Sequence, residues 1–290
     1  MTLLLQISDP HFGTEQPPVV AALQRLANIL QPDLVVMSGD ITQRARRAQF
    51  SAARAFVDTF GATPFIIVPG NHDIPLYNLF ARIAHPYANH RRVFGDDLEP
   101  VFESADLLVI GVNTTRAYRR KDGEISAQQV ERVVRRLDHA TPRQLRVVVT
   151  HQPVVAARTT DIRNLLHGRE HAIERWSQAG VDLILGGHIH LPYVTPLHVA
   201  YQDLPHQMWA VQAGTALSSR VRGRVPNSVN VIDYDGSRTD ARGALRRAIR
   251  RAIVARWDFS RASASFELNM QHELDLDSES SLKTPLATLL

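Results

Sequence analysis

The chain has 290 residues, of which 44% are hydrophobic and 21% charged, and this composition excludes disorder as the main state. No run approaches the roughly 20 apolar residues that a membrane-spanning helix needs, and the formal net charge of +4 is too small to indicate nucleic-acid binding by itself. The absence of cysteine excludes disulfides, thiolate metal ligands and cysteine nucleophiles. Since the first residues also lack a basic leader, we expect no signal peptide and a cytoplasmic location.

Short apolar runs recur along the first two thirds of the chain, and each leads to a residue that can take part in chemistry. They cover residues 3–7, 33–37, 65–68, 107–110, 145–149 and 181–185. Short runs rich in branched apolar side chains are typical of buried strands. Apolar residues at helical spacing predict helices over 19–30, 45–60, 126–137 and, more weakly, 169–179. Alternating strands and helices indicate a layered α/β sheet, whose sites lie beyond the carboxyl ends of the strands.

The last third of the chain has a different pattern. Residues 208–213 and 228–234 resemble strands without an intervening helix, so we expect antiparallel pairing there. Residues 241–257 fit either an apolar helical stripe with arginines opposite or a strand, and they form an appendage to the fold. We expect one domain over residues 1–272 and a frayed, acidic and then serine-rich tail over 273–290.

Seven oxygen and nitrogen donors follow the predicted strands, and they come together only if those strands lie side by side. The seven are Asp9, His11, Asp40, Asn71, His151, His188 and His190. Two cations need about this many ligands once one carboxylate bridges them and water fills the remaining positions. A single tetrahedral zinc ion would leave several donors without a role. The pattern therefore favours a dinuclear metal site.

This arrangement resembles the calcineurin-like metallophosphoesterases. Five blocks appear in the family's order: Asp9-Pro-His11, Gly39-Asp40, Gly70-Asn71-His72-Asp73, His151 and Gly187-His188-Ile-His190. The resemblance covers about two thirds of the chain. It implies an α/β (α+β) fold, a four-layer sandwich of two mixed β-sheets flanked by helices.

The resemblance also implies a role for each donor. One metal ion would be held by Asp9, His11, Asp40 and His190. The second would be held by Asp40, Asn71, His151 and His188, so that Asp40 bridges the two. His72 would protonate the leaving oxygen, because an alkoxide needs a proton from a group that titrates near neutral pH. Manganese or iron is favoured for the two divalent ions, and zinc or cobalt is possible.

Two positions depart from the pattern of better-known relatives. The family's phosphoprotein phosphatases have Gly-Asp-x-x-Asp-Arg-Gly, whereas this chain has Gln43 in place of the second aspartate. The departure argues against a protein phosphatase, and Gly39-Asp40-Ile-Thr resembles the bacterial cyclic-nucleotide phosphodiesterase (class III) branch. Many relatives have a second histidine after His151, where this chain has Gln152, so the hydrogen bonding around that ligand is expected to differ.

Several further residues have two interpretations each. Arg44 is a substrate contact or part of a solvated helix start, and Asn113 is a substrate contact or a turn residue. Asp73 orients His72 or belongs to a surface turn. The arginine-rich segments 116–121 and 220–224 could draw in anionic substrates, but we expect them to form solvated faces. The segment 242–256 is a core-packed element or a basic helix at an anionic membrane surface.

The sequence therefore predicts a metal-dependent phosphoric diester hydrolase that uses a metal-bridging hydroxide. A small phosphodiester, first of all a cyclic nucleotide, is the expected substrate. The alternatives are a pyrophosphatase acting on a nucleotide-linked lipid precursor, with peripheral membrane contact, and a non-catalytic metal-binding scaffold. A nuclease ranks below these, because no basic groove interleaved with aromatic residues is evident, and no stable nucleic-acid complex is expected. A homodimer is a further possibility.

Overall fold

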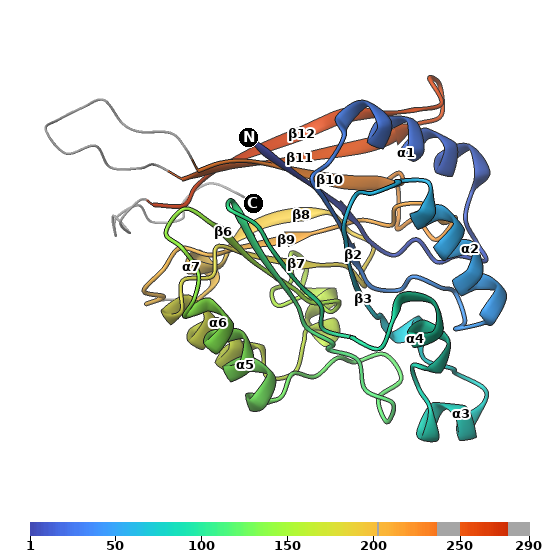
Figure 1. Cartoon of the computed structure of the whole chain (residues 1–290), viewed down its shortest axis with the longest axis horizontal. Coiled ribbons are helices and arrows are strands. Elements are labelled where there is room, and N and C mark those ends of the chain that lie inside the picture. Colours follow the sequence, from blue (N-terminus) through green and yellow to red (C-terminus); the bar gives the residue numbers. More distant parts are fainter. Residues whose placement is uncertain (202, 237–249, 278–290) are drawn as a thin grey trace, which may run out of the picture.

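The chain forms two six-stranded sheets that pack face to face, with helices on both outer faces (Figure 1). The structure is a computed structural model, and it describes residues 1–201, 203–236 and 250–277. The predicted four-layer sandwich is confirmed. Both sheets are mixed, since each contains parallel and antiparallel strand pairs.

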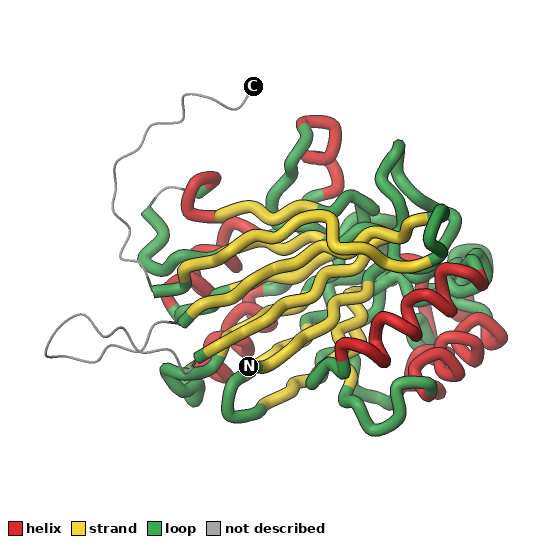
Figure 2. The backbone as a smooth tube through the Cα atoms, turned by 90° about the horizontal axis from the view of Figure 1, so that it is seen from above, coloured by secondary structure: helices red, strands yellow, loops and turns green. Residues whose placement is uncertain are grey.

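The first sheet has the strand order β12-β11-β10-β1-β2-β3. Its strands are β1 (Thr2–Ile7), β2 (Leu34–Ser38), β3 (Phe65–Val68), β10 (Ser228–Asp235), β11 (Arg251–Ser260) and β12 (Ser265–Asp275). Figure 2 shows strands running side by side when the molecule is seen from above. The three parallel strands β1, β2 and β3 are adjacent, so their carboxyl ends meet at one edge.

The second sheet has the strand order β4-β5-β6-β7-β9-β8. Its strands are β4 (Val101–Glu103), β5 (Leu107–Gly111), β6 (Leu145–Val149), β7 (Leu183–Gly186), β8 (Tyr193–Pro196) and β9 (Trp209–Gln212). β5, β6, β7 and β9 are parallel, so this sheet also gathers several carboxyl ends at one edge.

Helices cover the outer face of each sheet. They are α1 (Pro17–Leu30), α2 (Arg47–Asp58), α3 (Leu79–Ala84), α4 (Ala88–Phe94), α5 (Ala127–Leu137), α6 (Arg169–Gln178) and α7 (Leu197–Ala200), with short 3₁₀ turns at Asn71–Asp73 and Thr159–Asn164. α1 and α2 pack on the first sheet, and α5 and α6 pack on the second. In the part of the chain that the structure describes, none of these helices has the length and apolar character needed to cross a membrane.

The alternation of side chains along β2 explains why its sequence is apolar throughout. Leu34 and Val36 point into the core between the two sheets, whereas Val35 and Met37 point into the core under α1 and α2. Successive side chains of a strand face opposite ways, so a strand covered on both faces needs apolar residues at every position. The same packing fixes where each strand ends and places the polar residue that follows it.

The ambiguous segment 241–257 is a strand wherever the structure describes it. Residues 251–257 belong to β11, which pairs with β10 and β12, so the helical interpretation is wrong there. Ala252 and Val254 bury themselves between the sheets, and strand alternation rather than helical spacing brings them to that face. Residues 237–249 lie outside the described residues, and with them more than half of the segment 242–256, for which a core-packed element and a basic helix at a membrane were the two interpretations.

The frayed tail was predicted to begin at residue 273, but the ordered strand continues past that position. β12 continues to Asp275, and Leu274 and Leu276 are buried in the core between the sheets. The Arg250 side chain, itself only 6% exposed, forms an ion pair with Asp277. Apolar burial and this ion pair hold residues 273–277 against the fold, and residues 278–290 lie outside the described residues. The organisation of residues 1–272 as one domain stays a prediction.

Candidate metal centre

The seven predicted ligands all follow the carboxyl ends of parallel strands. Asp9 and His11 follow β1, Asp40 follows β2, Asn71 follows β3, His151 follows β6, and His188 and His190 follow β7. The two sheets bring these ends together, so residues up to 181 positions apart in the chain (Asp9 and His190) become neighbours. The convergence expected from the sequence is present.

The backbone at this edge adopts a conformation that L-residues avoid. Positive φ angles occur at Asp9 (48°), His11 (44°), Asp40 (48°), His188 (72°) and His190 (55°). A non-glycine residue in this region costs on the order of 1–3 kcal/mol and persists only where its surroundings hold it. Five of the seven predicted ligands share this strain, which indicates a site built for chemistry rather than a set of ordinary turns.

Two glycines allow the loops to approach each other closely. A Cβ at Gly70 would lie 2.0 Å from the backbone nitrogen of Asp40, and one at Gly187 would lie 1.9 Å from Ser8 Oγ and 2.4 Å from Asp9 Oδ2. Any side chain at either position would therefore push a carboxylate out of place. The glycines in the motifs preserve the geometry of Asp9 and Asp40.

Asp9, His11, Asp40 and His190 form the first group of donors, and their ligand atoms lie within 4.8 Å of one another. His190 Nε2 is 3.2 Å from Asp9 Oδ1 and 3.1 Å from His11 Nε2, which in turn is 3.7 Å from Asp40 Oδ2. All four side chains are buried or nearly so. Two carboxylates and two imidazole nitrogens at this spacing suit a divalent cation.

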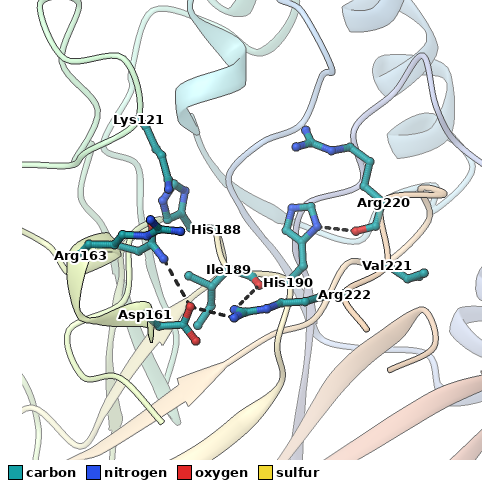
Figure 3. Close-up of a pocket in the computed structure, with 10 residues that line it drawn as sticks. Lys121, Asp161, Arg163, His188, Ile189, His190, Arg220, Val221 and Arg222 are labelled. Carbon is teal, nitrogen blue, oxygen red and sulfur yellow. Dashed lines mark hydrogen bonds and ion pairs between the residues drawn. The ribbon is translucent and has the colours of Figure 1, made fainter. Parts of the chain in front are cut away.

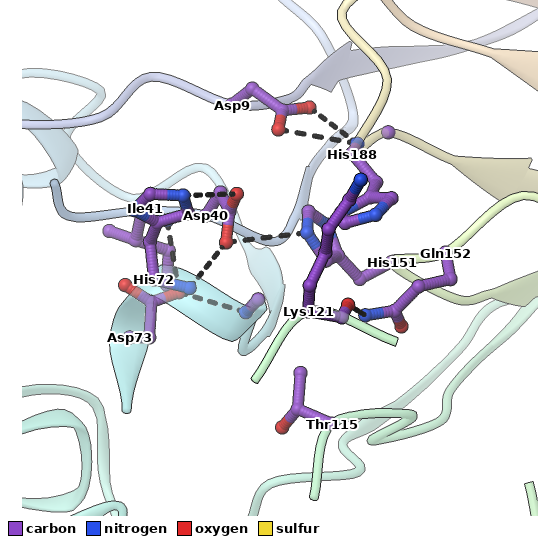
Figure 4. A network of polar contacts seen from close by, with 12 residues as sticks. Asp9, Asp40, Ile41, His72, Asp73, Thr115, Lys121, His151, Gln152 and His188 are labelled. Carbon is purple, nitrogen blue, oxygen red and sulfur yellow. Dashed lines mark hydrogen bonds and ion pairs between the residues drawn. The ribbon is translucent and has the colours of Figure 1, made fainter. Parts of the chain in front are cut away.

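Asp40, His151 and His188 form a second group whose ligand atoms also lie within 4.8 Å of one another. Asp40 Oδ1 is 3.3 Å from His151 Nε2, while its other oxygen faces the first group (Figure 4). Asn71 Oδ1 and both ring nitrogens of His188 are buried without a hydrogen-bond partner. Buried polar atoms are normally paired, so these atoms fit ligands that need a metal ion. Asp40 is thus shared by both groups.

Hydrogen bonds to backbone carbonyls orient two of the imidazoles. His151 Nδ1 donates to Ser38 O at 2.9 Å, and His190 Nδ1 donates to Arg220 O at 2.5 Å. Since the Nδ1 atom holds the proton in each case, Nε2 is left to act as a metal ligand. The outer hydrogen bonds that metal-binding histidines need are therefore in place.

The ionisation of the donors reflects burial and mutual charge. Burial lowers the pKa of His11 and of His188 to about 3, so both imidazoles are neutral at physiological pH and free to bind a cation. Burial alone would raise the pKa of Asp9, but the charge and hydrogen bond of His190 together with the charge of His151 outweigh burial and bring the pKa to about 2. Burial likewise opposes ionisation of Asp40, yet His151 and His72 hold its pKa well below the ordinary value.

His72 lies beside the two groups with its ring positioned by the loop after β2. His72 Nδ1 donates to the carbonyl of Gln43 at 2.9 Å, and Nε2 lies 4.0 Å from Asp40 Oδ2. The side chain is 28% exposed, so the ring contacts solvent. Gln43, which replaces the aspartate of the phosphatases, thus orients the His72 ring through its backbone carbonyl.

Asp73 has neither of the two roles considered for it. Its carboxylate is 1% exposed and accepts hydrogen bonds from the backbone of Ile41 (3.0 Å), Thr42 (2.8 Å) and Gly70 (2.8 Å). It therefore ties the loop after β2 to the loop after β3 instead of contacting the His72 ring. Burial and the nearby charge of Asp40 raise its pKa to about 6.

Arg220 is a site residue that the sequence interpretation as a solvated face missed. Its Nη1 atom lies 3.1 Å from Gln43 Oε1, 3.2 Å from His72 Nε2 and 3.4 Å from His11 Nδ1. The expected solvated face is therefore wrong for this arginine. Its position depends on the loop after β9, and no motif in the sequence marks that loop.

Lys121 also lies beside the donors, and Gln152 holds the loop that carries it. Gln152 is buried, accepts a hydrogen bond from Thr114 Oγ1 at 2.6 Å and donates to the carbonyl of Lys121 at 3.3 Å (Figure 4). Where a second histidine was expected, glutamine thus holds the loop that carries Lys121. The neighbouring Arg116 and Arg119 point elsewhere and pair with Glu124.

The structure separates the two candidate substrate contacts. Arg44 is exposed, and its guanidinium lies 5.5 Å from the centroid of the Tyr77 ring, at the wall of a cavity beside His72. The Asn113 side chain instead accepts hydrogen bonds from the backbone (3.0 Å) and hydroxyl (2.7 Å) of Thr115. Asn113 thus has a turn role, whereas Arg44 lines a cavity together with His72.

Two cavities flank the donors. The first, of about 490 Å³, is lined by His188 and His190 together with charged residues (Figure 3). The second, of about 460 Å³, is lined by Asn71 and His72 together with apolar residues. Lys121 borders both cavities. Each volume is in the range of small-molecule sites.

Comparison with known proteins identifies the family and two similar sequences. The family model of the calcineurin-like phosphoesterases matches residues 2–192. A probable cyclic nucleotide phosphodiesterase from Synechococcus sp. is 27% identical over 207 residues, which are 67% of this chain and 76% of that protein. A probable glycerophosphodiester phosphodiesterase from Arcobacter nitrofigilis is 24% identical over 170 residues, which are 55% of this chain and 57% of that protein.

Solved structures support the fold. A purple acid phosphatase from yellow lupin superposes with a TM-score of 0.67 at 12% identity, covering 100% of this chain and 57% of that one. A dimetal phosphatase from Danio rerio superposes with a TM-score of 0.59 at 12% identity, covering 95% of this chain and 99% of that one.

The matched segment spans well over half of the sequence and contains all seven donors, so the chain belongs to the calcineurin-like phosphoesterase family. The family and the names of both sequence relatives bear out the predicted class, a metal-dependent phosphodiester hydrolase. The clustered aspartates and histidines are placed for metal binding.

Proposed function

We propose that this protein is a dinuclear metal-dependent phosphodiesterase, with cyclic nucleotides first among its small substrates. The observation that carries the proposal is the position of Asp40. One carboxylate oxygen faces His11 in the first donor group, and the other faces His151 in the second. A carboxylate shared in this way suits two neighbouring cations better than one.

The residues present fit two ions. Asp9, His11, Asp40 and His190 would hold one, and Asp40, Asn71, His151 and His188 would hold the other. Nitrogen, carboxylate and amide donors suit manganese or iron first, with zinc and cobalt as alternatives. The chemistry that such a pair supplies when bound is activation of water and neutralisation of charge on the phosphoryl group.

The side chains around the donors supply the remaining chemistry. His72, held by the Gln43 carbonyl, presents Nε2 to the site and would give a proton to the departing alcohol oxygen. Arg220 and Lys121 reach the same space and would bind phosphoryl oxygens. His72, Arg220 and Lys121 come from separate loops but converge on one space, so an ester bound there would contact all three.

The relatives' names support the substrate class. One similar protein is named a probable cyclic nucleotide phosphodiesterase and the other a probable glycerophosphodiester phosphodiesterase. Both names describe hydrolysis of a small phosphodiester. The aromatic ring of Tyr77 under Arg44 offers a surface on which a nucleobase could stack.

The pyrophosphatase alternative needs a free basic face for membrane contact, and the described arginines of residues 250–256 do not provide one. Arg250 pairs with Asp182 and Asp277, Arg251 pairs with Glu273, and Arg256 pairs with Asp258. Paired arginines of a sheet do not form the free basic face that anionic lipid would bind. The scaffold alternative has no lost ligand in its favour, since all seven donors and His72 are present.

Turnover of bis(4-nitrophenyl) phosphate by the manganese-loaded protein tests the proposal, followed by a panel of cyclic nucleotides. We expect diester hydrolysis that a chelator abolishes and that added manganese restores. Asp40→Ala should be inactive, whereas the exposed carboxylate variant Asp58→Ala should match the wild type. Hydrolysis of the monoester 4-nitrophenyl phosphate alone would make the protein a phosphatase, and no hydrolysis with any divalent metal would favour the scaffold.

A further inference from the structure

Helix α3 is amphipathic in the reverse sense of an ordinary surface helix. Its charged residue, Arg82, is only 7% exposed, whereas Leu79, Phe80 and Ile83 are 67–78% exposed. A surface helix of a globular protein normally turns its apolar side chains to the core and its charged ones to water. The reversal leaves three large apolar side chains in water.

Hydrogen bonds hold Arg82 inside, so α3 does not turn over to bury its apolar face. The guanidinium donates to the Pro75 carbonyl at 3.1 Å through Nη1 and to the Arg119 carbonyl at 2.5 Å through Nη2. The Asn78 side chain caps the helix by accepting from the Ala81 amide at 2.9 Å. Turning the helix would break these contacts and take the donor away from two backbone carbonyls. The outward direction of the apolar side chains is therefore a fixed feature of the fold.

The apolar face of α3 continues into the loop before it. Tyr77 is 73% exposed and Leu76 is 41% exposed, so five large apolar side chains protrude within eight residues. We call these five residues the apolar ridge: Leu76, Tyr77, Leu79, Phe80 and Ile83. Contiguous exposed apolar surface usually marks a binding surface, whereas a single exposed apolar residue needs no explanation. The ridge therefore needs an occupant.

Cationic side chains border the apolar ridge. Arg120 and Lys121 line the second cavity together with Tyr77, and the Arg44 guanidinium lies 5.5 Å from the centroid of the Tyr77 ring. No carboxylate is among the described residues that line this cavity. Residues 74–95, which include the whole ridge, contain neither aspartate nor glutamate. The ridge thus lies in a region of unbalanced positive charge.

Apolar side chains next to positive charge fit the surface of a membrane that contains anionic lipid. The apolar groups enter the interface while the cations bind the headgroups. A second copy of this chain fits less well, because the same cations would face one another across the contact. A peptide ligand normally binds in a groove, whereas Figure 1 shows α3 at an outer corner of the molecule, away from both sheets.

We infer that the apolar ridge docks the protein onto a membrane surface that carries anionic lipid, with Phe80 and Ile83 inserted into the interface. Since Leu76 and Tyr77 also line the second cavity, docking brings the mouth of this cavity to the lipid surface. The ridge is remote from β11, whose arginines are paired with carboxylates (Figure 1). Docking of this kind is independent of which ester the enzyme cleaves, and so goes beyond the proposed function.

Co-sedimentation of the full chain with sucrose-loaded vesicles tests the docking. Vesicles of phosphatidylcholine alone are compared with vesicles that also contain about 30% phosphatidylglycerol, which supplies the negative surface charge. We expect a partition coefficient at least about tenfold higher for the anionic vesicles, and we expect it to fall as added salt screens the charges. No turnover enters this measurement, so its failure is distinguishable from a failure of the proposed function.

Variants of the ridge and of its cations sharpen this experiment. Phe80→Ser should lower the partition coefficient for anionic vesicles by about tenfold or more, because a large apolar side chain leaves the interface, and Phe80→Leu should retain most of the binding. Ile29→Ser is the matched control and should bind like the wild type, since Ile29 is also 78% exposed but lies on α1. Arg120→Ala should lower binding about fivefold, whereas Arg261→Ala, in the exposed turn between β11 and β12, should not. The melting temperature of Phe80→Ser should match the wild type, because the exposed ring is outside the core.

A wild-type protein that binds neither kind of vesicle would overturn the inference. Equal binding to neutral and anionic vesicles would overturn it as well, and so would binding that Phe80→Ser leaves unchanged. Sedimentation velocity checks the competing occupant. A wild-type dimer that Phe80→Ser converts to a monomer, together with no vesicle binding, would assign the apolar ridge to a second copy of the chain instead.

Discussion

The two donor groups of the centre differ in how many carboxylates they contain and in how closely their donor atoms contact one another. The first combines two carboxylates with two imidazoles, and its atoms already contact one another: His190 Nε2 lies 3.2 Å from Asp9 Oδ1. Asp40, which the second group shares, is its only carboxylate; an amide and two imidazoles complete that group, with Asn71 Oδ1 and the His188 ring nitrogens unpaired in the buried centre. Since affinity for a divalent cation rises with ligand charge, the first group should bind its ion more tightly.

A second comparison shows why an unpaired buried imidazole is not enough to identify a ligand. The ring nitrogens of His188 and of His90 are all buried without partners. His188 faces Asp40 and His151, whereas His90 packs against the rings of Phe50 and Phe94 at 5.9 and 5.3 Å. The neighbours, not the unpaired nitrogen, separate a ligand from a packed side chain.

Removing the shared ligand should have the largest effect. Asp40→Ala deletes the only carboxylate of the second group and one of two in the first, so at least one metal ion should be lost. We expect turnover to fall by about 10³-fold or more, since several kcal/mol of charge stabilisation depend on the ions. Elemental analysis after dialysis gives the metal content. Two ions per chain in this variant would refute the bridging role.

His72→Ala should leave the metal content unchanged and affect only some substrates. Alkyl diesters, whose alkoxide needs a proton, should slow by about 10²- to 10⁴-fold, whereas 4-nitrophenyl esters should slow far less, because nitrophenolate leaves without one. Rates for the two ester types in parallel check this. If both slow equally, His72 is not the proton donor.

Asn71→Ala should separate the two groups. It removes a neutral ligand from the second group only, so affinity for one ion should fall by at least about tenfold while the other ion stays bound. Titration with manganese, followed by its paramagnetic signal, should then show one tight and one weak equivalent. Loss of both ions together would mean that the groups do not bind independently.

The smallest effect concerns stability rather than turnover. Burial lowers the pKa of His90 to about 4, below its ordinary 6.5, so the unfolded chain binds a proton at a higher pH than the folded one does. The contribution of the neutral His90 imidazole to the free energy of unfolding is complete above pH 6.5. Protonation of the unfolded chain lowers that free energy by about 3 kcal/mol as the pH drops to 4. Denaturant unfolding at several pH values should show this loss in the wild type and a smaller loss in His90→Leu.

The exposed His85 provides the control for that comparison. His85→Leu should keep the wild-type dependence of the unfolding free energy on pH. If His90→Leu behaves in the same way as His85→Leu, the buried imidazole does not cause the acid sensitivity.

The sequence was enough to predict the parallel strands and the donors that follow them, because each donor comes shortly after an apolar run typical of a buried strand, whereas the arrangement in two sheets followed from the family resemblance. Asp40 after β2 and His151 after β6 are examples: the hydrophobic pattern fixes where the strand ends, and the next residues follow from it. Helix and strand could not be separated over 251–257, since those residues satisfy both spacings and only pairing with β10 decides.

Loop residues were beyond sequence reasoning for a physical reason. Arg220 reaches His72 because its own carbonyl is held by His190, and Lys121 is placed by the buried Gln152. These contacts join residues 30 and 31 positions apart in the chain, and such contacts leave no periodic signal in the sequence.

Anomalous diffraction from a crystal soaked in manganese tests the central claim most directly. The account predicts two peaks on either side of the Asp40 carboxylate, one among Asp9, His11 and His190 and the other among Asn71, His151 and His188. A single peak, or manganese bound only elsewhere on the molecule, would contradict it.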